Sequence, residues 1–342
     1  MVFTEAESYY ETTSLLTKIK SKVIRLPALN LLGVFQVLGA KGQNCDAYGS
    51  FNRFLDADKP YFIYLENPLA LYHYTIGRIS HGAGRKRFQA CLNDPNLKYI
   101  VCMSEACRDT FETINMPIPD RVKLKTIYPF VPQNPNITPA LVAEKSKGEY
   151  LECLYCVQGE RFVSKGGLEV LSAYERLRKQ NVKIHLTVIT KFSDLDSEAK
   201  KRLEDCSGVS CHDFTYSYEE LEKVYARTNV LLQPTSDDSF GLTVLEAMKG
   251  GCAVIGSKLY ALPEMVEHGV NGFLVEPKHW FFDKNNVPNP AVWNHRKHTI
   301  HSTKESARLV GEMEDLLLKL SRDRELLASM SLRSLELAGD KF

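Results

Sequence analysis

The stretch Asp238-Ser-Phe-Gly-Leu-Thr-Val-Leu-Glu246, which runs on through Ala247-Met-Lys-Gly-Gly251, places two carboxylates on either side of a predicted helix start. A polar turn opens here into an apolar helix, so the backbone N–H groups of residues 240–242 are expected to point, unpaired, out of the helix N-terminus. A helix start carries about half a positive charge and binds phosphate groups without a dedicated side chain. Gly241 would let a ligand approach the backbone closely, and Glu246 would accept hydrogen bonds from a ribose diol. The stretch therefore predicts a site that holds a phosphate, a sugar and a ribose together.

A simpler interpretation is that Glu246 closes an N-terminal turn and that Gly250 and Gly251 end the helix. The flanking sequence favours ligand binding, because it supplies strands and turns in a specific order. They are a strand at 229–234, a strand at 252–256, a segment at 262–269 and a turn at 271–277. The whole block resembles the nucleotide-binding half of the family-4 type of retaining glycosyltransferases (glycosyl transferases group 1), whose signature is an acidic residue, seven others and then Glu.

The resemblance implies an α/β fold of two Rossmann-like, doubly wound lobes that face a cleft, the B-type glycosyltransferase fold. In that family the first lobe binds the acceptor, the second binds the nucleotide sugar, and the anomeric configuration is retained. Asp238 stands where the family usually has Glu, which shortens its reach by one methylene and is expected to alter the donor sugar accepted. The resemblance is strong over residues 98–277 and weak before residue 60, so we expect a shortened first lobe. Relatives continue past the position of Phe342 into a helix that returns to the first lobe, which is consistent with a truncated chain.

The composition is that of an ordinary soluble globular protein, with 342 residues, 44% of them hydrophobic and 25% charged. This length has room for about two domains. The net charge of +1 gives no general attraction to nucleic acid, and no nucleic-acid partner is expected. No apolar run approaches the roughly 18 to 20 residues of a membrane-spanning helix, and the N-terminal sequence does not resemble a signal peptide. We therefore expect a cytoplasmic protein.

The cysteines and the paired aspartates are both interpreted as structural. The nine cysteines have no framework spacing, and the CxxC of Cys153 and Cys156 lies within a predicted buried strand, so reduced thiols are expected. Asp56-Ala-Asp58 and Asp194-Leu-Asp196 match the pairs that other transferases use to hold a divalent ion. The first precedes its strand and the second opens a helix, which is typical of turn and N-cap residues. No metal and no separate cofactor are expected.

From Leu151 onward, strand-like and helix-like periods alternate, which predicts a doubly wound parallel sheet whose ligands bind beyond the carboxyl ends of the strands. The predicted strands are 151–157, 183–190, 209–214, 229–233, 252–256 and 273–275, and the predicted helices are 167–179, 196–205, 218–227, 242–250 and 262–268. The earlier part predicts strands at 33–38, 61–65, 98–103 and 122–127, and helices at 46–55, 84–92 and 104–115. Four prolines within residues 129–139 indicate an extended linker. We predict an N-terminal acceptor-binding lobe at 1–140 and a C-terminal nucleotide-sugar-binding lobe at 141–342.

A second constellation lies between the first predicted strand of the C-terminal lobe and the helix that follows. Lys165, at a glycine-flanked helix start, could reach a diphosphate as a point charge, although alone it would be interpreted as a solvated surface lysine. The family resemblance implies a pyrophosphate clamp of Gly, Arg, four residues, Lys and Gly, which Gly159, Lys165 and Gly166 match in spacing. Glu160 occupies the arginine position. Either a local shift brings Arg161 into that role, or Lys165 acts without an arginine.

These residues have distinct expected roles. Lys165, Arg161 and the open helix start would stabilise the charge on a departing diphosphate. Asp238 would bind sugar hydroxyls, and Glu246 would bind the ribose. The predicted donor-binding set is Gly159, Lys165, Gly166, Ser239, Phe240, Gly241, Leu242 and Glu246, and the predicted catalytic set is Asp238, Lys165, Arg161 and Glu66.

On the acceptor side, Glu66 follows the strand at 61–65 and takes the place of a histidine that contacts the donor sugar in relatives. His81, Arg85 and Lys86 place a titratable ring and two cations at a predicted helix start. This segment either recognises an anionic or diphosphate-linked acceptor or is a solvated basic loop. The sequence leaves both interpretations open.

Two segments have the composition of membrane-contacting surfaces. Residues 15–26 mix four cations with an apolar face. The insertion at 280–298 carries both tryptophans of the chain and a basic cluster, and a loop of this length is usually functional or disordered. Peripheral contact with the inner face of a membrane, through a lipid-linked acceptor, would explain both segments. Core packing and subunit contact explain them equally well.

The sequence thus predicts a retaining, metal-independent glycosyltransferase of the hexosyltransferase class. It would move a hexose-type sugar from a UDP- or GDP-linked donor to a glycan, lipid-linked or other glycoconjugate acceptor in surface polysaccharide synthesis. Alternatives on the same scaffold are a sugar-nucleotide epimerase and a glycoside phosphorylase. An alternative of another class is a catalytically silent homologue that acts as a partner subunit, which Glu160, Asp238 and the short first lobe favour.

Overall fold

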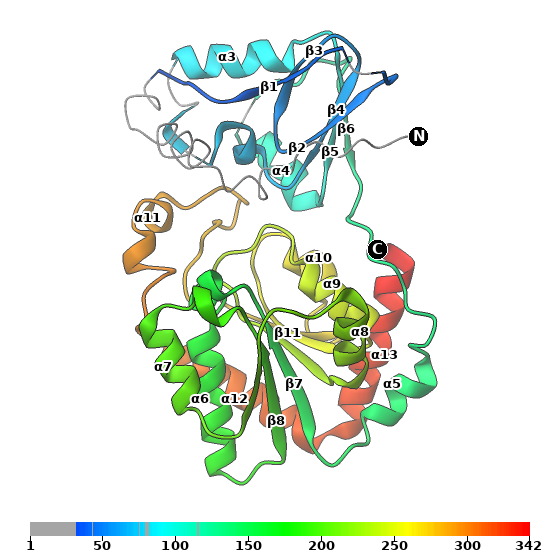
Figure 1. Ribbon diagram of the computed structural model, residues 1–342, viewed down its shortest axis with the longest axis vertical. Coiled ribbons are helices and arrows are strands. Elements are labelled where there is room, and N and C mark those ends of the chain that lie inside the picture. Colours follow the sequence, from blue (N-terminus) through cyan, green and yellow to red (C-terminus); the bar gives the residue numbers. More distant parts are fainter. Residues whose placement is uncertain (1–31, 43, 75, 79–81, 115) are drawn as a thin grey trace. The chain divides into compact units, whose positions relative to one another are not determined.

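The structure is a computed structural model that describes residues 32–342 with the exception of 43, 75, 79–81 and 115. It divides into two compact units (Figure 1). The first runs to Tyr128 and takes in Asn285–Val287, and the second comprises Pro129–Lys284 and Pro288–Phe342.

The second unit is built on a six-stranded, fully parallel sheet with the order β12-β11-β10-β7-β8-β9. Its strands are β7 (Leu151–Cys156), β8 (Ile184–Ile189), β9 (Val209–His212), β10 (Val230–Gln233), β11 (Ala253–Ser257) and β12 (Gly272–Val275). The chain builds outward from β7 to β9 and then returns to the other side of β7 with β10. These two strands are therefore neighbours at the topological switch point, where open α/β sheets bind ligands beyond the strand carboxyl ends. Each of the six strands overlaps a strand that the sequence predicts.

Helices lie on both faces of this sheet (Figure 1), which is why its strands are continuous apolar runs. The strands β10 and β11 are buried along their whole length. The helices are α6 (Gly167–Lys179), α7 (Ser197–Asp205), α8 (Tyr218–Arg227), α9 (Leu242–Lys249) and the short α10 (Leu262–Met265) and α11 (Pro290–Trp293). Asp196 is the N-cap of α7 and accepts hydrogen bonds from the backbone N–H groups of Glu198 and Ala199, so its interpretation as a cap is confirmed.

Helix α11 lies outside the predicted set, and so do three further helices of this unit, α5 (Pro139–Lys145), α12 (Ala307–Arg322) and α13 (Arg324–Lys341). Helix α12 packs beside α6, and α13 packs against both α9 and α5. Residues 129–140 belong with the second unit, so the division predicted at 140/141 falls inside it.

The first unit contains a four-stranded parallel sheet, β2-β4-β5-β6, and a two-stranded parallel pair, β1-β3. The strands are β1 (Val37–Ala40), β2 (Tyr48–Phe51), β3 (Phe54–Ala57), β4 (Tyr61–Leu65), β5 (Leu97–Cys102) and β6 (Lys123–Thr126), with helices α3 (Gly82–Leu92) and α4 (Glu105–Thr113). The helix predicted at 46–55 is wrong, because this segment forms β2 and β3. Asn52 lies between them with a φ of 57°, a conformation that asparagine tolerates, and parallel pairing with β4 overrides the local pattern. Phe54 and Phe88 meet edge to face in the core, with ring centroids 5.3 Å apart.

The structure also describes the cysteines of the CxxC motif, possible metal-binding clusters and possible membrane-spanning helices. Cys153 and Cys156 are buried free thiols in β7, as the sequence predicts, and burial raises the pKa of Cys156 to about 12. Among the described residues, no cluster of three or more His, Cys, Asp or Glu side chains could hold a metal ion. None of the helices in the described part of the chain has the length and hydropathy of a bilayer-spanning segment.

Candidate functional site

The loops that follow β7 and β10 contact each other at the switch point. The backbone N–H of Ser236 donates to the carbonyl of Ser164 at 2.9 Å. Gly166 has a φ of 85°, and a Cβ at this position would lie 2.6 Å from the carbonyl oxygen of Pro234. Only glycine combines this backbone conformation with so close an approach. The glycine therefore allows the two predicted motifs to pack directly against each other.

The side chains of Lys165 and Asp238 are in direct contact between these loops. The Nζ of Lys165 donates to Oδ2 of Asp238, and Nε2 of Gln233 donates to the same oxygen at 3.2 Å. Lys165 is 7% exposed and Asp238 is 8% exposed. The two motifs thus lie in contact, but Lys165 is not an open cation, because Asp238 already balances its charge.

The electrostatics of this pair favour the ionised carboxylate. Burial alone would raise the pKa of Asp238, but the positive charges of Lys165 and Arg161 and the hydrogen bonds from Lys165 and Gln233 outweigh it, and the pKa is lowered. Burial lowers the pKa of Lys165, and the charge of Asp238 opposes that effect. A ligand with negative charge would therefore compete with Asp238 for Lys165.

Arg161, rather than Glu160, faces the site. The Nη2 of Arg161 lies 2.9 Å from Oδ2 of Asp237 and donates to the Asp237 carbonyl at 2.6 Å. Glu160 is exposed in the same short 3-10 turn, η3 (Gly159–Arg161). Of the two alternatives left by the sequence, this geometry favours the one in which Arg161 takes the arginine position.

The N-terminus of α9 lies three residues beyond Asp238. Gly241 is its N-cap with a φ of 93°, and no side chain caps the helix. Phe240 is buried, Ser239 is partly buried, and Leu242 is 46% exposed. The first N–H groups of an α-helix have no partner within the helix. An anion that binds there would therefore also be close to the Lys165–Asp238 pair.

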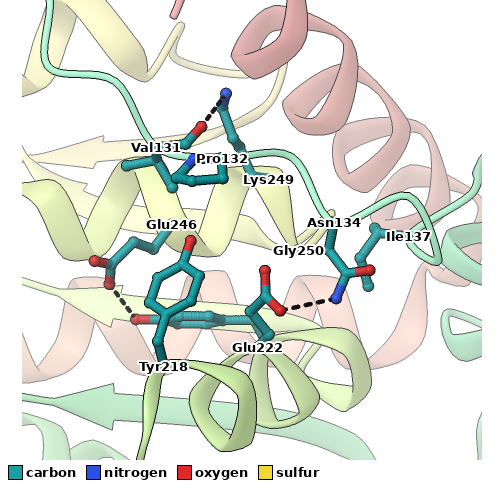
Figure 2. Close-up of a pocket in the computed structure, with 10 residues that line it drawn as sticks. Val131, Pro132, Asn134, Ile137, Tyr218, Glu222, Glu246, Lys249 and Gly250 are labelled. Carbon is teal, nitrogen blue, oxygen red and sulfur yellow. Dashed lines mark hydrogen bonds between the residues drawn. The ribbon is translucent and has the colours of Figure 1, made fainter.

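Glu246 lies in the middle of α9 and lines a small pocket (Figure 2). Its Oε2 accepts a hydrogen bond from the hydroxyl of Tyr225 at 2.8 Å. Burial raises the pKa of Glu246, and the hydrogen bond from Tyr225 partly opposes that rise. The simple interpretation, in which Glu246 closes the first helical turn, does not fit, because its partner belongs to α8.

The candidate acceptor residues belong to the first unit. Glu66 follows β4, and its carboxylate accepts a hydrogen bond from the hydroxyl of Tyr74. Arg85 and Lys86 are exposed on α3. His81 and the cationic segment at 15–26 lie outside the described residues.

Sequence reasoning missed three polar residues of the site, Gln233, Asp237 and Tyr225. Gln233 could have been found from the sequence, because it is a polar residue at the end of a predicted apolar strand that precedes the motif at 238–246. For Tyr225 the indication was weaker. This residue lies seven positions after Tyr218, so both rings are on the same face of α8.

Comparison with known protein families gives a match over residues 155–282 to the family described as Glycosyl transferases group 1. The matched span contains Lys165, Asp238 and Glu246. Residues 155–282 are thus similar to this family, and the match covers less than half of the chain.

Several curated proteins are similar to part of this chain. An uncharacterized glycosyltransferase of Methanocaldococcus jannaschii is 30% identical over 92 residues, which cover 25% of this chain and 23% of that protein. A sucrose synthase of Thermosynechococcus vestitus is 38% identical over 61 residues, which cover 18% of this chain and 8% of that protein. The chain thus spans less than a quarter of the length of either relative.

The fold of the chain is also similar to solved structures. The structure of the Anabaena protein HepE in complex with UDP and glucose has a TM-score of 0.57 and 15% sequence identity, and the match covers 83% of this chain and 68% of that one. At this identity the likeness concerns the fold alone. The predicted α/β fold of two Rossmann-like lobes is confirmed.

Proposed function

We propose that the chain is a retaining, metal-independent glycosyltransferase that moves a hexose-type sugar from a UDP- or GDP-linked donor. The acceptor would be a glycan, a lipid-linked sugar or another glycoconjugate, and the reaction would serve surface polysaccharide synthesis in the cytoplasm or at the inner face of the membrane. The observation that carries this proposal is the contact of Lys165 with Asp238 beside the uncapped N-terminus of α9, at the switch point of a parallel sheet. The complex of HepE with UDP and glucose supports the choice of donor class.

The proposed chemistry is substitution at the anomeric carbon. The bond from this carbon to the diphosphate oxygen breaks and its electron pair stays on the diphosphate. The acceptor hydroxyl oxygen forms the new bond to the anomeric carbon, and its proton passes to the departing diphosphate. Lys165, Arg161 and the N–H groups of residues 240–242 would stabilise the departing diphosphate. Asp238 would bind sugar hydroxyls once the ligand shares Lys165, and Glu66 is the candidate for the first-unit residue that contacts the donor sugar.

Calorimetric titration with UDP and GDP tests the binding half of this proposal. We expect one of the two to bind the full chain. A panel of nucleotide sugars, incubated without acceptor, should then show slow hydrolysis of one donor. If the full chain binds no nucleoside diphosphate, the proposal is wrong.

The substitution Glu246→Ala is expected to weaken nucleoside diphosphate binding about 10- to 100-fold, the range for losing hydrogen bonds to a charged group. The physical reason is that the carboxylate accepts hydrogen bonds from the ribose hydroxyls. Glu222→Ala is a matched control, because Glu222 lines the same pocket but bonds to Asn134. A dissociation constant that Glu246→Ala leaves unchanged would contradict the ribose contact.

A second candidate function is a silent homologue that binds nucleotide sugar as a partner subunit. The pairing of Lys165 with Asp238 favours it, because the lysine already has a buried counter-charge. Binding of a nucleotide sugar without hydrolysis or transfer, with or without lipid extract, would support this candidate over the enzyme.

A further inference from the structure

Three side chains of α8 line the pocket that Glu246 lines. Tyr218, Glu222 and Tyr225 follow one another at spacings of four and three residues, so they share one face of the helix. The pocket lies within the second unit.

Tyr225 is the residue of this face that holds Glu246. Its hydroxyl donates to Oε2 at 2.8 Å, and Tyr225 is only 3% exposed. The other charged side chains of the pocket are bonded elsewhere. Glu222 accepts a hydrogen bond from Asn134 at 3.0 Å, and Lys249 donates to a backbone carbonyl at 2.6 Å (Figure 2). Among the described residues, Tyr225 is thus the one hydrogen-bond donor to the Glu246 carboxylate, which leaves Oε1 available to a ligand.

We propose that Tyr225 is a positioning residue for nucleotide binding, whose hydroxyl fixes the Glu246 carboxylate in the orientation that accepts the hydroxyls of a ribose. The inference rests on the proposed function, in which Glu246 binds the ribose. A carboxylate that is fixed before the ligand arrives loses less side-chain entropy on binding than a freely rotating one.

The hydrogen bond from Tyr225 also controls the charge on Glu246. It lowers the pKa of Glu246 against the effect of burial, while burial and the charge of Glu246 raise the pKa of Tyr225, which therefore keeps its proton. The other titratable or charged groups near Glu246 are Tyr218, Glu222, Lys249 and Cys156. Without the hydroxyl, the pKa of Glu246 rises further. Because the ionised carboxylate accepts the ribose hydrogen bonds, binding would then begin to weaken at a higher pH as the pH is lowered.

The test compares the full wild-type chain with Tyr225→Phe by calorimetric titration with UDP, GDP and their 2′-deoxy counterparts over a range of pH. Tyr225→Phe is expected to weaken binding of the ribonucleotide about 3- to 10-fold, part of the value of a charged hydrogen bond. It should weaken 2′-deoxynucleotide binding less, so that the preference for ribose shrinks. The acid limb of the affinity should move to higher pH, because the pKa of Glu246 rises without the hydroxyl. The titration of the nucleotide phosphate is common to both proteins and does not contribute to the difference.

Two further variants make the result specific. Tyr218→Phe removes a hydroxyl from the same pocket and is expected to leave both the ribose preference and the acid limb unchanged. In a Glu246→Ala background, where the acceptor of the Tyr225 hydroxyl is absent, Tyr225→Phe should have no additional effect on affinity.

The possible failures are distinguishable. If the wild type binds a nucleoside diphosphate but Tyr225→Phe leaves the ribose preference and the acid limb unchanged, the positioning role is wrong and the proposed function stands. An equal loss for ribose and deoxyribose ligands, with an unmoved acid limb, indicates packing alone and also overturns the inference. If the wild type binds neither UDP nor GDP, the inference and the proposed function both fail.

Discussion

Replacing Lys165 with methionine is expected to slow donor hydrolysis and sugar transfer by a factor of about 10² to 10³, the typical loss when one preorganised donor to a developing charge is removed. Lys165 is buried against Asp238 beside the N-terminus of α9. A diphosphate that left at this point would gain negative charge as its bond to the sugar breaks, and in the proposed mechanism the ammonium group would stabilise that charge in a site largely closed to water. Methionine keeps the length and loses the charge. The measurement is the rate of nucleotide release at saturating donor.

The same substitution removes the charge that balances Asp238. Breaking a buried ion pair from one side costs about 3–5 kcal/mol of unfolding free energy, so Lys165→Met should also be less stable. The double variant Lys165→Met with Asp238→Asn removes both charges, and we expect it to recover stability without recovering the rate. Lys179→Met changes an exposed lysine at the end of α6 and should alter neither quantity. A folded Lys165→Met protein with the wild-type rate would contradict the role given to this lysine.

The sheet of the second unit and the helices between its strands could be predicted closely, because their local and tertiary signals agree. Strands such as β10 and β11 are buried along their length and appear in the sequence as short apolar runs that end at polar residues or glycine. Helices α7 and α8 begin at Asp196 and Ser217, whose side chains cap them. Where the hydrophobic period, the capping residue and the burial agree, the type of an element and its first residue can be predicted from the sequence alone.

The first unit was harder because its elements are short and their pairing is not local. The segment at 46–55 has no glycine or proline break long enough to separate two strands, yet β2 pairs with β4 and β3 pairs with β1. Asn52 makes the change of direction with a positive φ, which no periodicity can indicate. Tertiary pairing therefore outweighs the intrinsic preference of this segment.

The candidate site was predictable as two motifs but not as an ion pair. Each motif follows a predicted strand, and the resemblance assigns both to phosphate and sugar. Lys165 and Asp238 are 73 residues apart in the sequence, and they meet because β7 and β10 are adjacent in the sheet order. A sequence does not state that order. The burial that makes Asp238 a counter-charge for Lys165, rather than an open ligand, follows only from the packing of the two loops.

The insertion at 280–298 lies between β12 and α12. A buried ion pair just before it, between Lys278 and Glu169, anchors the start of this segment in the second unit. Nζ of Lys278 lies 3.0 Å from Oε1 of Glu169 in α6 and also donates to the carbonyl of Ser302 at 3.0 Å. The Glu169 side chain is fully buried, and its Oε1 also accepts from the backbone N–H of Ser306 at 3.1 Å. Farther along, Phe281 stacks on Trp293 at 4.5 Å, and the Arg296 guanidinium lies 4.2 Å above the Trp293 ring. These contacts support core packing, one of the alternatives that the sequence left open for this segment.

The substitution Lys278→Met is expected to reduce the unfolding free energy by about 3–5 kcal/mol, because it leaves the Glu169 carboxylate buried without a cation. Urea unfolding followed by tryptophan fluorescence suits this test, since both tryptophans of the chain, Trp280 and Trp293, lie in the insertion. The fluorescence change should precede the loss of helical signal in circular dichroism, because the insertion would detach before the sheet unfolds.

Two variants separate the ion pair from other effects of changing a lysine in this region. Lys297→Met alters an exposed lysine of the same insertion and should leave the unfolding midpoint unchanged. Lys278→Met combined with Glu169→Leu removes both charges and should recover much of the lost stability, because an apolar pair of similar size replaces a buried ion pair at little cost. If Lys278→Met unfolds at the wild-type urea concentration, the ion pair does not anchor the insertion. If the double variant is less stable than Lys278→Met alone, the packing of the Glu169 side chain, and not its charge, is what α6 contributes to this contact.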